Sequence, residues 1–545
     1  MKAIKLILII VIKIYFAIEI SSQTVAWEWS ISGGGVSDDI GKSIFIDSNS
    51  DIIVCGLFNS TAFFDSLQIT SMTYWGGGFI SKIDTGGNFQ WVKCISGTNY
   101  TNISSVATDM QGNIFITGDF KETSYIDSVS IISYDHSDGF IGKFNPHGEL
   151  LWIKTFGFKD MDGGIDLISN DTMVFLCGVF KDSIYLDTTL LISNGNTDIF
   201  IASLDSYGNY QWIEQIGGTW WDVPRSISID NNNDIILSGI LSETVSFGNT
   251  DTSAISNGSS DAFIAKYSTN GDFYWVKSFG GIEDDGNIAA SSDFENNIFL
   301  SGFFKGNVYF DGIPLTSYNE YDYFICKLST NGSVIWAKKI ETTFYPIEDF
   351  WNKSLICDES GNLYITGWYR DSLVYDSLTV QSNGSYDIFV MKIDNNGNLI
   401  WCLTAGNNHS YGDYSRSIAR DGNGNLYITG RFYSTLFFGD SSVTSYGSAD
   451  VFVAKLHEDP VSVVYNEDNT SLEITVYPNP ATDYVNIGYP LMQFEKVEIV
   501  SVKGRVLRTF NGNQNILDVS GLASGVYLLK LDAGKMIYVK RIIIQ

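Results

Sequence analysis

Basic residues and catalytic motifs are scarce in this chain. It has 33 lysines and arginines against 62 acidic residues, which gives a formal net charge of −29. Such a field repels phosphate backbones and argues against nucleic acid as a partner. There is no HExxH motif and no serine or cysteine in a nucleophile elbow. The sequence therefore assigns no catalytic residue, although carboxylate pairs of the glycosidase kind form only in space and remain open.

The six cysteines also lack a functional pattern. There is no CxxC pair and no spacing typical of a metal site. Cys55 and Cys177 occupy the same position of a repeat, and the other four fall in or beside predicted strands. We therefore expect buried thiols, although an oxidising compartment would permit disulfides.

Long apolar runs are absent after the N-terminus. Lys2 and Lys5 precede a mostly apolar stretch from Leu6 to Ile20, and a cut after Ser22 would remove it. This pattern predicts a secretory signal peptide over residues 1–22, and an uncleaved membrane anchor is the alternative, since Lys13 interrupts the run. The run is short for a membrane span and no second one follows, so we expect no transmembrane span in the mature chain.

What the chain has instead is a repeat. A tryptophan recurs every 60 to 65 residues, and a glycine follows the same ladder from Gly56 to Gly430. A fixed period of this kind marks a repeat architecture. Abundant aromatic residues, 14% of the chain, and 52 glycines suit strands joined by tight turns. The tryptophans are Trp29, Trp91, Trp152, Trp212, Trp275, Trp336 and Trp401.

Each module reads as four short strands, with the tryptophan in the fourth. The first tryptophan strand, Ala26 to Ser32, precedes all other strands, and the last module, which ends near Lys455, has none of its own. A closed ring explains this offset, because the N-terminal strand then completes the seventh sheet, whereas an open solenoid would need caps at both ends. We predict an all-β fold with a seven-bladed β-propeller over residues 23–456, and tryptophans that lie between the blades.

The module follows a consensus. It reads Asp-x-x-Gly-Asn-hydrophobic-Tyr-hydrophobic-Thr-Gly, then Asp-x-Phe-hydrophobic-x-Lys, then Gly-x-hydrophobic-x-Trp, and it is clearest at Gly361 to Gly367 and Gly424 to Gly430. This pattern resembles the bacterial secreted β-propeller repeat family over about Ala26 to Lys455. The resemblance implies the fold and an extracellular setting, and it transfers no catalytic residue.

The tail follows a different pattern. Residues 457–470 are polar and acidic, as in a linker, and strand-like runs over 471–545 predict a small Ig-like β-sandwich. This stretch resembles the C-terminal sorting domain of the type IX secretion system, subtype A, which implies export across the outer membrane by that machinery, followed by surface attachment or release. An ordinary Ig-like ligand-binding module is the alternative. The motif residues include Pro478, Asn479, Pro480, Gly525, Lys540 and Arg541.

Three turns between the first and second strands carry Asp-x-Asn-x-Asp/Asn. Alternate oxygens at this spacing can wrap a hard cation, so calcium is a candidate cofactor. The motif lacks a glycine at its sixth position and a bidentate acid at its twelfth, and Asx turns that bond to their own backbone are the alternative. The residues are Asp47, Asn49 and Asp51; Asp230, Asn232 and Asp234; and Asp421, Asn423 and Asn425.

The loops that lead into the first strand of a module are acidic. Asp39, Asp222, Asp285 and Asp413 share one position, and Asp349 lies one residue further out. A ring of acids at one face could bind a cation or a basic group. Hydrogen bonding within each loop is the alternative.

The same loops hold the least repeat-like residues. Variable aromatic side chains on the loops of a rigid scaffold are typical of recognition, and aromatic faces beside acids and amides suit sugars or peptides. Packing within the loops is the alternative. The ligand-binding candidates are Trp220, Trp221, Tyr345, Trp351 and Tyr411.

These features together favour a secreted binding or adhesion protein that is not an enzyme. Its ligand would be an extracellular glycan or protein. An extracellular hydrolase or lyase acting on carbohydrate, and a structural protein of the cell surface or matrix, are the alternatives.

Overall fold

The computed structural model divides the chain into two compact units, Met1–Glu458 and Asp459–Gln545. The first is described over residues 25–248, 252–318, 320–343 and 354–458, and the second over residues 475–477, 481–488, 494, 496–501, 506–511, 514, 516–523, 525–532 and 537–544. Every regular element in these ranges is a β-strand, which confirms the all-β prediction. The predicted signal peptide lies outside the described residues.

The first unit repeats one antiparallel group of four strands, and seven such groups can be traced in its described residues. The first strands are β2 (Ile40–Ile46), β8 (Thr101–Thr108), β14 (Gly163–Ser169), β18 (Val223–Ile229), β24 (Gly286–Ser292), β30 (Leu355–Cys357) and β34 (Tyr414–Arg420). The second strands are β3 (Ile52–Phe58), β9 (Ile114–Phe120), β15 (Met173–Leu186), β19 (Ile235–Leu241), β25 (Ile298–Phe304), β31 (Leu363–Tyr375) and β35 (Leu426–Phe438).

The two outer positions of each group complete the pattern. The third strands are β6 (Gly77–Ile83), β12 (Asp138–Phe144), β16 (Thr189–Asp205), β22 (Asp261–Tyr267), β28 (Asp322–Leu328), β32 (Leu378–Ile393) and β36 (Ser441–Glu458). The fourth strands are β7 (Phe89–Gly97), β13 (Leu150–Lys159), β17 (Tyr210–Gly217), β23 (Phe273–Phe279), β29 (Val334–Thr343), β33 (Leu399–Ala405) and, for the last group, β1 (Val25–Gly35). Second and third strands are buried on both faces, since the sheets pack face to face.

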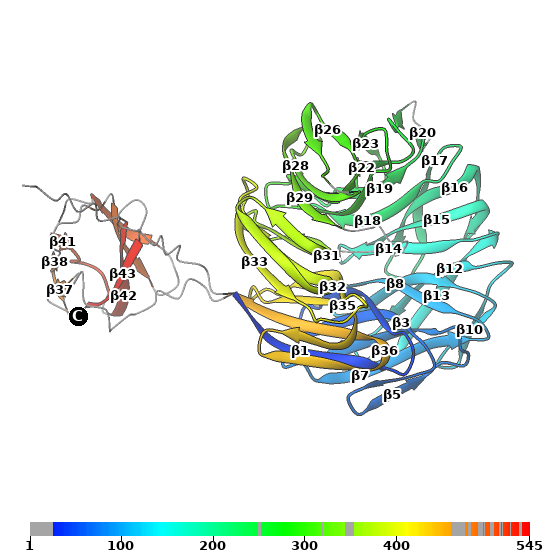
Figure 1. Cartoon of the computed structure of the whole chain (residues 1–545), viewed down its shortest axis with the longest axis horizontal. Coiled ribbons are helices and arrows are strands. Elements are labelled where there is room, and N and C mark those ends of the chain that lie inside the picture. Colours follow the sequence, from blue (N-terminus) through cyan, green and yellow to red (C-terminus); the bar gives the residue numbers. More distant parts are fainter. Residues whose placement is uncertain are drawn as a thin grey trace, which may run out of the picture. The chain divides into compact units, whose positions relative to one another are not determined.

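The first strands lie side by side around a ring. Each contacts the first strand of the next group, and β34 contacts β2, so the order closes on itself (Figure 1). The last group takes its fourth strand from the N-terminus, because β1 pairs antiparallel with β36 and places Trp29 opposite Lys455. This register confirms the predicted pairing of the N-terminal strand. A cavity of about 450 Å³ lies between the first strands, and its lining is rich in isoleucine and also includes serine and asparagine side chains and Arg420.

A hairpin that the sequence analysis missed follows the second strand of every group. Its first arm pairs with the fourth strand of the preceding group, as β4 (Thr61–Phe64) does with β1, so it covers a free edge and joins neighbouring groups. The sequence pattern that predicts this hairpin is a turn residue between two short runs of alternating polar and apolar residues. Asp65, with a φ of 55°, is one such turn residue. The other separate hairpin strands are β5 (Leu67–Thr70), β10 (Thr123–Ile126), β11 (Val129–Ile132), β20 (Thr244–Phe247), β21 (Ser253–Ile255), β26 (Asn307–Phe310) and β27 (Ile313–Thr316).

The repeated tryptophans lie between groups, as predicted. In six of them the indole Nε1 donates to a backbone carbonyl in the turn between the third and fourth strands of the next group. Trp212, for example, donates to the carbonyl of Thr269 at 3.0 Å. The ring lies against Gly271 of that turn, where φ is +88° and a Cβ would come within 2.8 Å of the indole. Only glycine satisfies both requirements.

Two further predictions concern the start of the linker and the state of the cysteines. The strand β36 continues to Glu458, so the predicted linker begins two residues too early, because the Glu458 side chain bonds to the preceding group; residues 459–470 lie outside the described residues. All six cysteines are described, and Cys55, Cys177 and Cys326 are buried, as expected.

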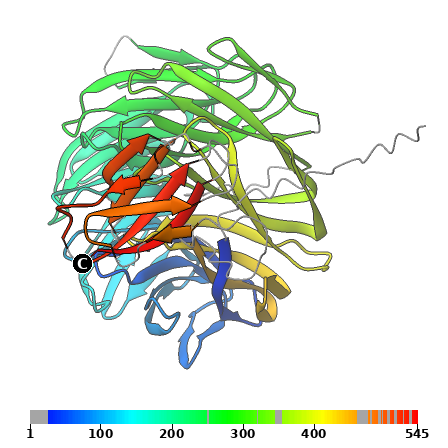
Figure 2. The same cartoon turned by 90° about the vertical axis from the view of Figure 1, so that its left-hand side faces the viewer.

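The second unit contains two sheets that share one core. One sheet holds β37 (Thr475–Tyr477), β38 (Tyr484–Gly488) and β41 (Ile516–Asp518), and the other holds β39 (Lys496–Ser501), β40 (Val506–Asn511), β42 (Gly525–Asp532) and β43 (Ile537–Ile544). Val485 and Leu517 of the first sheet pack in one cluster with Ile499 and Leu529 of the second. These strands are orange to red in Figure 2.

Candidate functional site

One face of the ring is formed by the loops that connect successive groups. Five of these loops are bonded to the third strand of the group that they leave, or to the residue before that strand: the amide of Asp222, for example, donates to the carbonyl of Thr197 at 2.9 Å, and that of Asp39 to Ala449 at 2.7 Å. Since all groups share one strand order, these loops lie on one side, which we call the entry face. The described loops are residues 36–39, 98–100, 160–162, 218–222, 280–285 and 406–413.

Trp220 and Trp221 project from one of these loops. Their side chains are 56% and 60% exposed. The loop backbone is fixed, because the carbonyl of Trp221 accepts a hydrogen bond from Ser242 Oγ at 2.9 Å and a β-bridge joins Trp221 to Thr197. A fixed backbone with two exposed indoles can stack on a sugar ring or an apolar side chain.

Tyr411 lies on another loop of the same face and is 63% exposed. Its ring stacks on Tyr433 at 5.2 Å and on His409 at 5.4 Å, which holds it in one orientation. The structure does not bring Tyr411 together with Trp220 and Trp221, because two connecting loops separate them one way round the ring and three the other way. The candidates Tyr345 and Trp351 lie outside the described residues.

An aromatic and arginine cluster beside Tyr411 was missed in the sequence analysis. Trp368 packs edge-on against Tyr386 at 5.1 Å and Tyr414 at 5.3 Å, and the Arg431 guanidinium lies 4.8 Å from the Tyr414 ring. The uneven distribution of arginine along the sequence could have predicted this cluster. The first 224 residues contain no arginine, whereas four of the five arginines between residues 25 and 458 fall within residues 370–431.

The three Asp-x-Asn-x-Asp/Asn motifs form Asx turns. In the first, Asp47 Oδ1 accepts the amides of Asn49 at 2.8 Å and Asp51 at 3.0 Å. The Lys82 ammonium lies 2.7 Å from Asp47 Oδ2 and 3.0 Å from Asp51 Oδ2, where the motif would hold a cation. This geometry favours the Asx-turn interpretation.

The other two motifs repeat this arrangement with one variation. Asp230 accepts the amides of Asn232 and Asp234, and Lys266 lies between the two carboxylates. Asp421 accepts the amides of Asn423 and Asn425, and the Asn425 amide group donates to its second oxygen at 2.7 Å. Among the described residues no group of three or more histidine, cysteine or acidic side chains could hold a metal ion.

The acidic loop residues are buried, and their carboxyls accept hydrogen bonds from two segments of the chain. Asp222 Oδ2 accepts the amide of Gly218 at 2.8 Å, and its Oδ1 accepts that of Ser242 at 3.0 Å, so one carboxyl ties its own loop to the next hairpin. Asp39, Asp285 and Asp413 make the same kind of bonds, and so does Asp162, which the sequence analysis did not single out. Burial raises the pKa of Asp222 to about 7. The geometry favours loop bonding over an open acidic ring.

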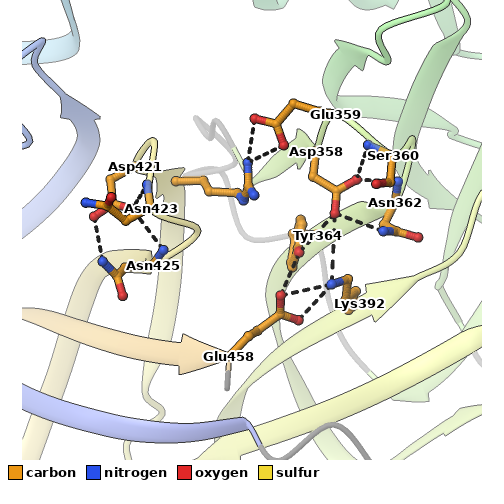
Figure 3. Close-up of polar contacts among 11 residues, drawn as sticks. Asp358, Glu359, Ser360, Asn362, Tyr364, Lys392, Asp421, Asn423, Asn425 and Glu458 are labelled. Atoms are coloured by element: carbon orange, nitrogen blue, oxygen red, sulfur yellow. Dashed lines mark hydrogen bonds and ion pairs between the residues drawn. The ribbon is translucent and has the colours of Figure 1, made fainter. Parts of the chain in front are cut away.

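The opposite face carries one polar cluster where the ring closes. Glu458, the last residue of β36, lies 2.9 Å from Lys392 Nζ and 2.9 Å from the Tyr364 hydroxyl (Figure 3). It also accepts the indole N–H of Trp401 at 2.5 Å. Asp358 lies 3.9 Å from the same ammonium. All of these side chains are at least half-buried, so the cluster holds two neighbouring groups together and is not an open binding site.

The sorting-motif residues lie partly within the described strands. Gly525 begins β42, and Lys540 and Arg541 lie on β43 opposite Leu529 and Leu528. Pro478, Asn479 and Pro480 lie outside the described residues.

Comparison with known families identifies both parts. A family described as "Beta-propeller repeat" matches residues 90–119 and 405–438, and one described as "Secretion system C-terminal sorting domain" matches residues 475–545. The chain is a β-propeller repeat protein with a C-terminal secretion sorting domain. This sorting domain, of the type IX system, directs the propeller protein across the outer membrane to the cell surface or the extracellular space. No helix with the length and apolar character of a membrane span occurs in the described residues.

Individual relatives are distant. An uncharacterised WD repeat-containing protein, L264, of Acanthamoeba polyphaga mimivirus is 24% identical over 67% of this chain, which spans about a third of that protein's length (33%). A puromycin hydrolase structure covers 84% of this chain and 59% of its own at 8% identity, with a TM-score of 0.41. A Synechocystis apocarotenoid oxygenase covers 69% and 74% at 10% identity, with a TM-score of 0.34. These similarities say nothing of the propeller protein's activity.

Proposed function

We propose that the protein is an extracellular binding or adhesion scaffold, in which the seven four-stranded groups are the blades of one propeller and the second unit is an Ig-like sandwich. The ligand that we propose is an extracellular glycan. The observation that carries this proposal is the set of exposed aromatic side chains on the entry face, which differ from one blade to the next on an otherwise repeated scaffold.

These side chains are exposed while their backbones are held. Trp220 and Trp221 stand on a loop bonded to the neighbouring hairpin, and Tyr411 is fixed in a stack of three rings. Clustered exposed apolar side chains, unlike isolated ones, are typical of interaction sites. Preorganised aromatic faces bind with little loss of side-chain entropy, which favours recognition of sugar rings.

The experiment is binding of the full-length secreted protein to an array of glycans and polysaccharides in calcium-containing buffer. We expect a saturable hit. The variant Trp220→Ala/Trp221→Ala or the variant Tyr411→Ala should weaken it by about tenfold or more, as expected for an aromatic anchor.

The matched control is Tyr207→Ala/Phe294→Ala, which removes two exposed aromatic rings from turns on the opposite face and should bind as the wild type does. A blank array would contradict a glycan ligand and favour a protein partner, to be sought by crosslinking on the cell surface. Release of sugar products would instead favour the carbohydrate-active enzyme.

A further inference from the structure

Ten aspartates form five buried pairs on the entry face. One member of each pair lies in a connecting loop, and the other lies in the third strand of the group that the loop leaves. Every one of the ten is at most 3% exposed. The pairs are Asp39 with Asp450, Asp162 with Asp138, Asp222 with Asp198, Asp285 with Asp261, and Asp413 with Asp387.

Each pair leaves one oxygen without a hydrogen bond. In the pair of Asp222 and Asp198, both oxygens of Asp222 accept backbone amides, and Asp198 Oδ2 accepts the Asn194 amide at 3.0 Å and Gln215 Nε2 at 2.8 Å. Asp198 Oδ1 is buried and has no partner. The same oxygen is unpartnered in Asp138, Asp261, Asp387 and Asp450, so five pairs repeat one vacancy for a donor.

In the pair of Asp39 and Asp450, the unpartnered oxygen and the loop carboxyl both lie close to one glycine. A Cβ on Gly34 would lie 2.5 Å from Asp450 Oδ1 and 2.9 Å from Asp39 Oδ2, so both oxygens flank one point. Glycine stands at this position in all five pairs, and a Cβ on any of them would collide with the strand aspartate. The equivalent glycines are Gly34, Gly157, Gly217, Gly280 and Gly406.

The strongest charges acting on the pairs do not compensate them. No described lysine or arginine is among the groups that act most strongly on any of the ten carboxyls. The nearby charges that act on them, apart from their partners, are those of Asp38, Asp135, Asp160 and Asp284, and all are negative. Two ionised carboxylates in such a site would repel each other without compensation.

One group of the ring has other residues at all three positions of this arrangement. At the second tryptophan the strand aspartate becomes Gly77, the glycine becomes Ser96 and the loop aspartate becomes Thr101. Thr101 Oγ1 there shares a hydrogen bond of 2.6 Å with Ser124 Oγ. Both carboxyls are therefore replaced together by neutral groups, as expected if each needs the other.

We infer that each pair is a binding site for one proton, held between Oδ1 of the strand aspartate and Oδ2 of the loop aspartate, and that this proton joins neighbouring groups of the ring. The protonated strand carboxyl donates to the loop carboxylate, which fills the vacant donor position and removes one of the two charges. Calcium fits less well, because it takes six to eight oxygen ligands and three of the four oxygens already accept N–H groups.

Such sites make the ring sensitive to pH. Burial raises the pKa of Asp39 to about 8, of Asp162 to about 8 and of Asp222 to about 7, from 3.8 for an exposed aspartate. The folded protein therefore holds protons that the unfolded chain releases. The resulting stabilisation is complete below about pH 3.8 and is lost as the pH rises through about 7 to 8.

The test is the thermal midpoint of the full chain at about pH 5 and about pH 9. Asparagine mimics a protonated aspartate, because its Nδ2 can donate where Oδ1–H would. We therefore compare the wild type with a variant in which asparagine replaces Asp138, Asp198, Asp261, Asp387 and Asp450. The wild type should lose more of its midpoint between the two pH values than the variant, and the variant should be the more stable protein at the higher pH.

A matched control changes the net charge equally at exposed hairpin turns, by asparagine at Asp65, Asp127, Asp187, Asp311 and Asp376. It should keep the wild-type pH dependence. An unchanged pH dependence in the buried variant would overturn the inference. So would stabilisation of the wild type at the higher pH by about 5 mM calcium that the buried variant lacks, because the sites would then hold a metal.

Discussion

Six boundaries of the ring differ from the seventh in how the chain crosses them. In six, the tryptophan of one group bonds to the turn between the third and fourth strands of the next group. Trp401 faces the group closed by β1, whose third and fourth strands come from opposite ends of the described unit and share no turn. There the indole bonds instead to the Glu458 carboxylate. A side chain thus replaces a backbone contact that the repeat supplies everywhere else.

The replacement also changes the electrostatics of this boundary. In four of the other groups the lysine of the third strand pairs with the Asx-turn aspartate of its own group, as Lys82 does with Asp47 at 2.7 Å. Lys392 lies 3.9 Å from its own Asp358 but 2.9 Å from Glu458. Glu458 at the end of β36 therefore binds a cation and an indole of the preceding group, and the contacts at this boundary depend on that one residue.

The largest effect should follow from removing the closing strand. Without residues 25–33 the edge of β36 is open and the last tryptophan contact of the ring is absent at Trp29. Unpaired strand edges associate with one another. We expect aggregation and loss of a cooperative thermal transition, measured by light scattering and circular dichroism. A soluble shortened protein with the wild-type midpoint would contradict closure by β1.

Trp401 and Glu458 should be coupled, and a distant tryptophan should not be. Trp401→Ala removes a buried indole and should cost about 3–5 kcal/mol, as for other core tryptophans. Glu458→Ala should cost about 3 kcal/mol, because Lys392 loses its nearest anion. Combined, the two changes should cost less than their sum by at least about 0.5 kcal/mol in urea unfolding.

Trp212→Ala is the matched control for this cycle, because its indole bonds to a backbone turn far from Glu458. Trp212→Ala and Glu458→Ala should add within about 0.5 kcal/mol. Equal coupling of both tryptophans to Glu458 would show that the carboxylate acts on the ring as a whole and has no special role at the closing boundary.

The closing strand could be predicted, whereas the closing contact could not. The offset of the first tryptophan strand is visible in the order of modules, so Trp29 and its strand had only one place in a ring. Glu458 follows the last recognisable repeat residue, Lys455, and was assigned to a linker. Its role depends on two facts that only the structure shows together: the last group has no turn between its third and fourth strands, and Trp401, 57 residues away, bonds to Glu458 in place of that turn.

The site residues divide in the same way. Trp220, Trp221 and Tyr411 depart from the repeat and are exposed, as expected of recognition residues. The loop aspartates keep to the repeat, and their burial was not visible, since nothing in the sequence shows that a hairpin covers them. In this chain, a polar residue repeated in the same loop position is buried and hydrogen-bonded to the backbone, whereas the aromatic residues that depart from the repeat are exposed.

The smallest net effect should come from copying one natural variation of the repeat, found in the third group, into the first group. The third group has Ser169 where others have the turn aspartate, and Ser203 where they have the lysine, so both members of the buried pair change together. Lys82→Ser alone should cost about 3–5 kcal/mol, because it leaves Asp47 buried without its cation.

Adding Asp47→Ser should recover most of that loss, to within about 1 kcal/mol of the wild type, because two neutral hydroxyls need no counter-charge. Urea unfolding of the two single variants and the double variant measures this directly. If the double variant were as unstable as Lys82→Ser, the amide bonds that Asp47 accepts from Asn49 and Asp51 would matter more than the ion pair. The repeated aspartate would then be retained for its turn, and the lysine would follow it only to neutralise the charge.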